Sequence, residues 1–252
     1  MGMFIFLLIL LLLWQGTYFL GVDVFHAFHS YAVPSPIGVA GRFMELCVNG
    51  SLPSAVLHSL GRGAVGFVLA AFIGIVLGFL IYHFKYLQKN MKPVVLGIQT
   101  LPSICWVPFS ILWFGLSNAA IIFVVVMGSA FSIAIAVDNA FRNIPPIYEK
   151  VARTMGADRK QLYVDVIFHA ALPELFSGLK QGWAFAWRAL MSGEVMTTSI
   201  GLGQTLVMGR DLADIDQVML VMLVIILVGI VVDKCFFSTV ENQMLIRRGL
   251  KR

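Results

Sequence analysis

Two charged residues, Arg188 and Glu194, stand inside a largely apolar part of the sequence, the stretch 172–196. An ionisable side chain is costly in hydrocarbon, so it usually turns toward a partner or a water-filled cavity. Two interpretations of Arg188 stay open. It could attract an anionic solute, or it could make a buried salt bridge or contact backbone carbonyls.

No other group of residues predicts catalysis or a metal centre. His26 and His29 have a spacing compatible with a metal on a helix, but no third ligand is evident. The cysteines at 47, 105 and 235 show no paired metal-type spacing. No nucleophile, base and orienting acid can be assembled at membrane depth. We therefore expect no catalytic residue, no metal ligand and no cofactor bound by this chain.

The elements that position Arg188 and Glu194 are predicted to be membrane helices. Of the 252 residues 59% are hydrophobic and 12% charged, which is not the composition of a water-soluble domain. A spanning helix needs about 20 mostly apolar residues. Five runs meet this requirement clearly: Met3–Leu20, Ala64–Phe84, Val94–Gly115, Asn118–Val137 and Val218–Phe237. A sixth, weaker candidate, Leu172–Met196, is interrupted by charges and could instead lie flat at the interface.

The distribution of basic residues predicts the orientation of these spans. Lysine and arginine concentrate after the second span, after the fourth span and at the end of the chain. The positive-inside rule makes these segments cytoplasmic, so both termini lie inside and the number of spans is even. This favours the sixth span. The net charge of +5 is then a topology signal and not a sign of nucleic-acid binding. The first run lacks a basic n-region and is expected to be an uncleaved helix.

Several residues within the spans are candidates for a translocation path. Pro102 and Pro108 interrupt the third span, and irregular backbone at membrane depth survives only where protein or a water-filled cavity covers it. The Gly74–Gly78 spacing allows close helix approach, which we interpret as ordinary packing. The tryptophans at 183 and 187 share a helical face near small residues. The predicted pathway or gate residues are Gln99, Ser103, Trp106, Trp183, Trp187, Arg188 and Glu194.

The stretch 148–166, "YEKVARTMGADRKQLYVDV", is polar in a chain that is otherwise apolar. Pro145 and Pro146 suit the start of a helix after a possible cap at Asn143, and Gly156 is expected to end that helix. Asp158 can cap a second helix, with Gln161 at the capping-box position. The sequence therefore predicts two short helices joined at a glycine on the cytoplasmic face.

This loop resembles that of binding-protein-dependent ABC importer permeases, in which a Glu-Ala-Ala triplet, a later glycine and a Leu-Pro mark a coupling helix. "KVARTMG", "ADRKQL" and "ALP" carry the likeness, with Ala152, Gly156 and Ala157 at the small positions and Lys150 and Val151 departing from the triplet. The resemblance implies that a helix docks in a groove of an ATP-binding subunit. The docking residues it implies are Tyr148, Glu149, Lys150, Val151, Ala152, Arg153, Met155, Gly156, Ala157 and Arg159.

The resemblance extends over roughly residues 33 to 245. "VPSP", "LPSICWVPFSILWFGLSN", "GWAFAWRALMSGEVM" and "GLGQ" look like the nitrate/sulfonate/taurine/bicarbonate branch of these permeases. The branch implies an all-α integral membrane protein of the type I ABC importer permease fold with six transmembrane helices per subunit. It also implies an acidic residue near position 194, which supports a structural or gating role for Glu194. We divide the chain into a first helix and periplasmic segment (1–63), a permease core (64–245) with the coupling loop 138–170, and a basic tail (246–252).

The resemblance also implies partners. They are two ATP-binding ABC subunits, a periplasmic or lipid-anchored substrate-binding protein, a second permease copy and membrane lipid. The chain holds no G-x-x-x-x-G-K-[ST] phosphate loop, so ATP and Mg are expected on the partner subunits. The implied solute is a small anion such as a sulfonate, nitrate, taurine or bicarbonate. A vitamin precursor or aromatic acid is the alternative, and a stand-alone ion-coupled transporter is an alternative of another class.

Overall fold

The computed structural model describes residues 2–26, 29 and 32–247, and every regular element in those ranges is a helix. Internal contacts divide the chain into two discontinuous units. Unit 1 comprises Met1–Leu60 and Glu194–Val228, and unit 2 comprises Gly61–Gly193 and Gly229–Arg252. The predicted basic tail, 246–252, falls mainly outside the described residues.

Four helical stretches of the described chain are long and apolar enough to cross a membrane, and a bent pair would make a fifth crossing. One of the four confirms that the predicted sixth span, 172–196, is helical despite its charges. The first apolar run forms α1 (Gly2–Tyr18) and the adjoining π-helix η1 (Phe19–Val24), of which Ile9–Val22 is a described apolar helix. Helices thus occupy all six predicted runs within the described residues. The four stretches are Ser51–His83, Asn118–Arg142, Arg159–Val195 and Ile215–Met244.

The predicted third span is broken. α4 (Lys85–Gln99) and the following pair η2 (Ser103–Trp106) and α5 (Val107–Phe114) meet at a 99° bend. Pro102 stands at the bend, where it has no N–H to continue the helix and restricts the residue before it. The expectation of an interrupted segment is confirmed, and the run 94–115 consists of helices joined at this bend.

In unit 1 the "VPSP" turn fastens α2 (Pro36–Val48) to the start of α11 (Ile215–Val232). The Ser35 hydroxyl caps α2 by accepting a hydrogen bond from the Gly38 N–H at 2.9 Å. The backbone N–H of Ser35 donates to Asp216 Oδ1 at 2.8 Å. The first turn of α2 is thus held by a side chain from far along the chain.

In unit 2, α3 (Ser51–His83) and α6 (Asn118–Arg142) pack at close range through glycines. A Cβ built on Gly74 would lie 2.7 Å from the Ala130 carbonyl oxygen, and one on Gly78 would collide with the Ala134 carbonyl. The interpretation of this glycine pair as ordinary packing is confirmed.

Lys180 joins α9 (Phe168–Val195) to the last helical stretch, which comprises η4 (Asp233–Ser238) and α12 (Thr239–Arg247). Its Nζ lies 3.3 Å from Glu241 Oε2 and 3.6 Å from Asp233 Oδ2. These ion pairs hold Lys180 between the two helical stretches.

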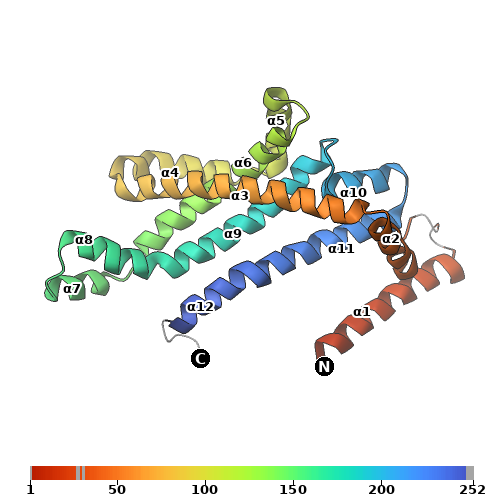
Figure 1. The fold of residues 1–252 in the computed structure, drawn as a ribbon, viewed down its shortest axis with the longest axis horizontal. Helices are drawn as coiled ribbons and strands as arrows, with labels where there is room; N and C mark the ends of the chain where they lie inside the picture. The colour runs from red at the N-terminus through yellow and green to blue at the C-terminus, as the bar shows by residue number, and fades with distance from the viewer. Residues whose placement is uncertain (1, 27–28, 30–31, 248–252) are drawn as a thin grey trace. The chain divides into compact units, whose positions relative to one another are not determined.

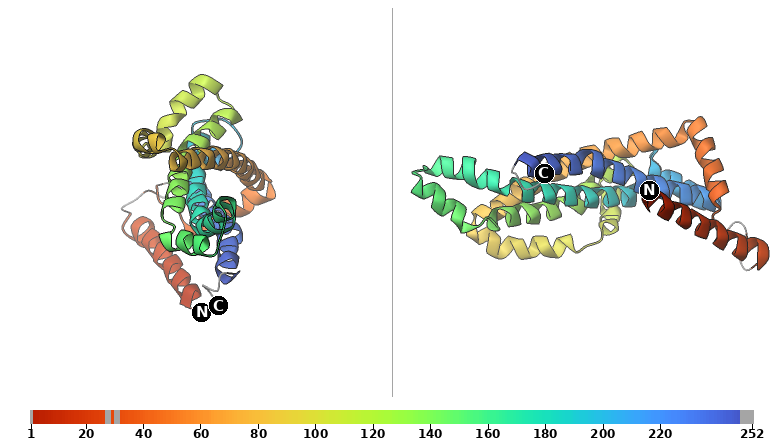
Figure 2. Two further views of the ribbon diagram at one scale, coloured as in Figure 1. Left: turned by 90° about the vertical axis from the view of Figure 1, so that its left-hand side faces the viewer. Right: turned by 90° about the horizontal axis from the view of Figure 1, so that it is seen from below.

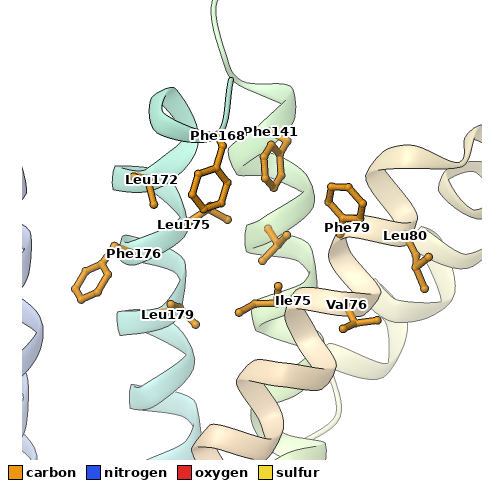
Figure 3. A pocket seen from close by; sticks show the side chains of 11 residues that line it. Ile75, Val76, Phe79, Leu80, Phe141, Phe168, Leu172, Leu175, Phe176 and Leu179 are labelled. Atoms are coloured by element: carbon orange, nitrogen blue, oxygen red, sulfur yellow. The ribbon is translucent and has the colours of Figure 1, made fainter. Parts of the chain in front are cut away.

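An apolar groove of about 550 Å³ runs between α3, α6 and α9 in unit 2 (Figure 3). Phe79 on α3, Phe141 on α6 and Phe168 on α9 face it at one level. Every residue that lines it is hydrophobic.

Candidate functional site

The polar stretch at 148–166 forms a helical hairpin beyond the paired ends of α6 and α9 (Figures 1 and 2). It comprises α7 (Pro146–Thr154), α8 (Arg159–Gln161) and the π-helix η3 (Leu162–Ile167), which leads into α9. Two short helices with a turn between them were predicted, and this is confirmed.

Gly156 ends α7 as expected. Its φ is +84°, a left-handed conformation in which L side chains are strained. The Ala157 N–H reaches back to the Ala152 carbonyl at 3.0 Å, and the Gly156 N–H donates to the Arg153 carbonyl at 3.0 Å. These bonds satisfy carbonyls that the end of the helix leaves without partners.

The predicted capping box of the second helix is confirmed. Asp158 Oδ1 accepts from the Gln161 N–H at 2.7 Å, and Gln161 Oε1 accepts from the Asp158 N–H at 3.0 Å. Asn143, by contrast, does not cap α7. It is the C-cap of α6, its side chain donates to Glu174 Oε1 at 2.7 Å, and Pro145 occupies the cap position of α7.

The two faces of α7 differ. Ala152 is 6% exposed and is buried within this chain, and α7 packs against η3. Arg153 and Glu149 pair along the helix at 2.7 Å. The remaining face carries four large hydrophobic side chains that are about half exposed or more: Ile147 58%, Tyr148 48%, Val151 49% and Met155 82%. The small residue thus serves the hairpin itself, and the outward surface is apolar.

A buried ionic cluster lies at the base of the hairpin, and the sequence reasoning missed it. Asp138 on α6 is fully buried, and its two oxygens lie 2.6 Å from Lys92 Nζ of α4 and 2.7 Å from Arg142 Nε. The Arg142 guanidinium also donates to the Ile81 carbonyl at 3.2 Å, at the end of α3. Asp138 therefore ties α4 to α6, and Arg142 extends the cluster to α3, just before the chain enters α7.

A signal for this cluster existed in the sequence. Asp138 and Arg142 are four residues apart, which places them on one face of a helix. The lysines and arginines of this region were interpreted only as markers of topology, so their possible ion pairs with Asp138 were not considered.

Glu194 is the second fully buried carboxylate, in unit 1. The Ser59 hydroxyl lies 2.8 Å from both of its oxygens, and the Gly203 N–H donates to Oε2 at 2.9 Å. Ser59 Oγ in turn accepts from the Leu202 N–H at 2.9 Å. Because Leu202 and Gly203 open α10 (Leu202–Asp211), the carboxylate lies at the positive end of that helix.

The "GLGQ" stretch fits this carboxylate because its glycines lack side chains. A Cβ on Gly201 would lie 2.6 Å from Glu194 Oε1, and one on Gly203 would lie 2.5 Å from Glu194 Cβ. Both distances are shorter than real Cβ contacts. The structure thus explains a motif that the sequence offered only as a likeness.

Arg188 is exposed and contacts its own helix. Its Nε donates to the Ala184 carbonyl at 3.2 Å, and its guanidinium lies 4.6 Å from the centre of the Phe185 ring. Of the two interpretations, contact with a backbone carbonyl is the one present here. A role in attracting an anion stays a prediction.

The predicted pathway tryptophans of α9 are packed inside unit 2. Trp183 and Trp187 are each 7% exposed and their rings stack with centroids 6.0 Å apart. Gly63 lies against both rings, and Gly229 lies against Trp187. That these two residues border a pathway stays a prediction.

The bend between α4 and α5 brings one predicted pathway residue to α9. Ser103 Oγ lies 3.3 Å from Ser192 Oγ. Gln99 Oε1 is buried and makes no hydrogen bond to any described part of the chain. Trp106 packs on Phe109 and Phe123. Pathway roles for Gln99, Ser103 and Trp106 stay predictions.

No group of three or more histidine, cysteine, aspartate or glutamate side chains within the described ranges could hold a metal ion. His26 Nδ1 instead lies 2.9 Å from the Val22 carbonyl oxygen. Outside the spans, a hydrogen bond to Glu45 and the nearby Asp214 carboxylate raise the pKa of Arg42 above its ordinary value. Arg42 thereby stays a fixed positive charge on α2.

Comparison with known proteins gives consistent matches. Residues 70–243 match the family described as "Binding-protein-dependent transport system inner membrane component". The putative aliphatic sulfonates transport permease protein SsuC of Bacillus subtilis (strain 168) is 27% identical over 237 residues, which cover 94% of this chain and 84% of that protein. The riboflavin transport system permease protein RibX of Chloroflexus aurantiacus is 30% identical over 214 residues, 85% of this chain and 78% of RibX.

The fold also has a solved counterpart. A chain from inward-facing conformations of the MetNI methionine ABC transporter has a TM-score of 0.61 and 21% identity, and the match covers 84% of this chain and 99% of that one. At this identity the likeness concerns the fold alone.

Proposed function

This chain belongs to the family of binding-protein-dependent transport system inner membrane components, and we propose that it forms the translocation path for a small anionic solute. It is a multi-pass membrane permease of an ABC importer. The solute, of the sulfonate, nitrate, taurine or bicarbonate class, is delivered by a separate binding protein. Two ATP-binding subunits hold ATP and Mg and dock on α7, a second copy of this chain completes the permease, and both termini are cytoplasmic.

The outward face of α7 is the observation that carries the docking part of this proposal. α7 and its C-cap residue Met155 carry four large hydrophobic side chains that are about half exposed or more. An exposed apolar patch rimmed by polar residues is typical of a protein interface. Met155, 82% exposed, has the most area to bury against a partner.

The ends of the hairpin support its movement as one body. The helix end at Gly156 and the capping box at Asp158 close the turn, and Asn143 binds Glu174 across the two chain segments that enter and leave the hairpin. A force applied to α7 therefore reaches both α6 and α9. Alternation between inward-open and outward-open states of the permease would follow from ATP-driven closure of the partner subunits.

Co-purification tests the docking surface. Met155→Glu places a charge in the apolar face and should abolish retention of a candidate ATP-binding partner subunit. Met208→Glu is the matched control because Met208 is 50% exposed on α10 of unit 1, and it should retain the subunit. Full retention by Met155→Glu, with both variants eluting as the wild type does in gel filtration, would refute docking on this face.

A vitamin precursor or another heterocycle is the second candidate solute, because RibX is as similar to this chain as SsuC is. The binding protein is expected to set most of the specificity, so the discriminating experiment is calorimetry on that protein. Taurine, an alkanesulfonate and nitrate are titrated in one series and riboflavin in another. Saturable binding of riboflavin alone would replace the anionic solute with the second candidate.

A further inference from the structure

The apolar groove between α3, α6 and α9 does not end in open solvent at the hairpin. A second cavity of about 420 Å³ adjoins it and shares Phe79, Phe141 and Phe168 with it. The second cavity adds polar and charged groups, among them Tyr82, Tyr163 and Arg159. The two cavities therefore form one channel-like surface that is apolar along its length and polar at the end near α8.

The polar end has free donors. Arg159 is exposed and makes no ion pair within the described residues, whereas Arg142 and Arg153 are both paired. Neither the Tyr82 nor the Tyr163 hydroxyl makes a hydrogen bond in those same ranges, and His83 lines the same cavity. Asp158 is the carboxylate near Arg159 in the adjoining small cavity, and its Oδ1 is already engaged by the Gln161 N–H.

A ligand that fits both ends must be an amphiphile with a negative head. A fully apolar occupant would leave Arg159 and the phenols unused, and a small anion would leave the long hydrophobic part empty. Guanidinium groups bind phosphate oxygens through charge-assisted hydrogen bonds. Basic pockets between transmembrane helices on the cytoplasmic side are typical sites for anionic lipid head groups.

We propose that one anionic phospholipid binds unit 2, with an acyl chain in the groove of Figure 3 and its phosphate at Arg159. The lipid fills the space between α3, α6 and α9 and anchors at the start of the helical stretch that leaves the hairpin. This site is distinct from the solute path and from the apolar face of α7, although Arg159 belongs to the hairpin implied to dock the ATP-binding subunit.

Native mass spectrometry of the full chain tests the site. The protein is released from nanodiscs of phosphatidylglycerol and phosphatidylcholine, and it should retain one phosphatidylglycerol per chain. Arg159→Gln should lower that retained fraction about fivefold, as expected for one basic residue near a membrane surface. Lys160→Gln, the neighbouring exposed lysine that lines neither cavity, should leave it unchanged.

A second pair of variants tests the acyl chain separately from the head group. Val76 lines the groove at 44% exposure, and Val68, two turns earlier on α3, is 64% exposed and lies outside it. Val76→Trp should displace the lipid and Val68→Trp should not. Equal retention of the two phospholipids by the wild type, or equal loss in both members of either pair, would overturn the proposal. A disulfide between two copies through Val76→Cys would also overturn it, because a protein helix would then fill the groove.

Discussion

Asp138→Asn should destabilise unit 2 through the loss of one buried negative charge. The substitution keeps the volume and the hydrogen-bonding oxygen of the side chain. It leaves Lys92 and Arg142, which lie 2.6 and 2.7 Å from the carboxylate, without their counter-ion. Removal of one partner from a buried ion pair costs about 3–5 kcal/mol.

The partial exposure of the two cations lowers this expected cost. The side chains of Lys92 and Arg142 are 24% and 28% exposed, so both cations can turn toward water when the carboxylate is gone. We therefore expect Asp138→Asn to reduce the free energy of unfolding by about 2 kcal/mol. Lys92→Met should cost about 1 kcal/mol, because Arg142 continues to neutralise Asp138.

Titration with sodium dodecyl sulfate in mixed micelles measures these free energies. The double variant, Asp138→Asn with Lys92→Met, should lose less free energy of unfolding than the sum of the two single variants, with a coupling of about 1 kcal/mol. Lys89→Met is the control, since this exposed lysine lies one turn earlier on α4 and makes no ion pair within the described chain. Additive losses in the double variant would show that Lys92 and Asp138 are not coupled, and an equal loss in Lys89→Met would show that the effect is not specific to the cluster.

Three further predictions follow from the local geometry, the first with a control variant. Gly203→Ala should destabilise the chain by about 1–3 kcal/mol because its Cβ would lie 2.5 Å from Glu194 Cβ. Gly61→Ala is the control, and it should stabilise the chain by about 0.5–1 kcal/mol because no atom lies within 4 Å of the added Cβ. The same micelle titration measures both free energies. Asp158→Ala should weaken the start of α8 by about 1 kcal/mol, seen as faster amide hydrogen exchange in 159–162. Gly156→Ala should cost about 1–2 kcal/mol at φ +84°, seen as faster exchange at the end of α7.

Each of these outcomes has a contrary result. A stabilising Gly203→Ala would mean that α10 does not approach Glu194 closely. Unchanged exchange in Asp158→Ala would mean that the capping box contributes nothing to α8. Unchanged exchange in Gly156→Ala would mean that the left-handed residue is not what ends α7.

The parts of the fold that depend on local chemistry could be predicted from the sequence. Gly156 and the Asp158–Gln161 capping box form hydrogen bonds with residues a few positions away, so their spacing in the sequence was sufficient to predict the helix end and the helix start. The bend at Pro102 was signalled by the missing N–H, but its angle of 99° depends on what α5 packs against.

The sites depend on contacts between distant residues, and the sequence could not supply them. Ser59 and Glu194 are 135 positions apart, and Lys92 and Asp138 are 46 apart. Ala152 was assigned to a partner's groove because small residues suit close docking, and the same property suits its place against η3. A periodicity shows that a face exists but does not show which neighbour covers it.

The cluster at Asp138 also has a consequence for biogenesis. A carboxylate near the end of an apolar helix opposes the transfer of that helix from the translocon into lipid. Lys92 belongs to α4, which is synthesised before α6, and Arg142 follows Asp138 by one turn. The counter-charge on α4 is therefore already in place when Asp138 emerges, so the order of the helices along the chain allows α6 to insert as part of a pair.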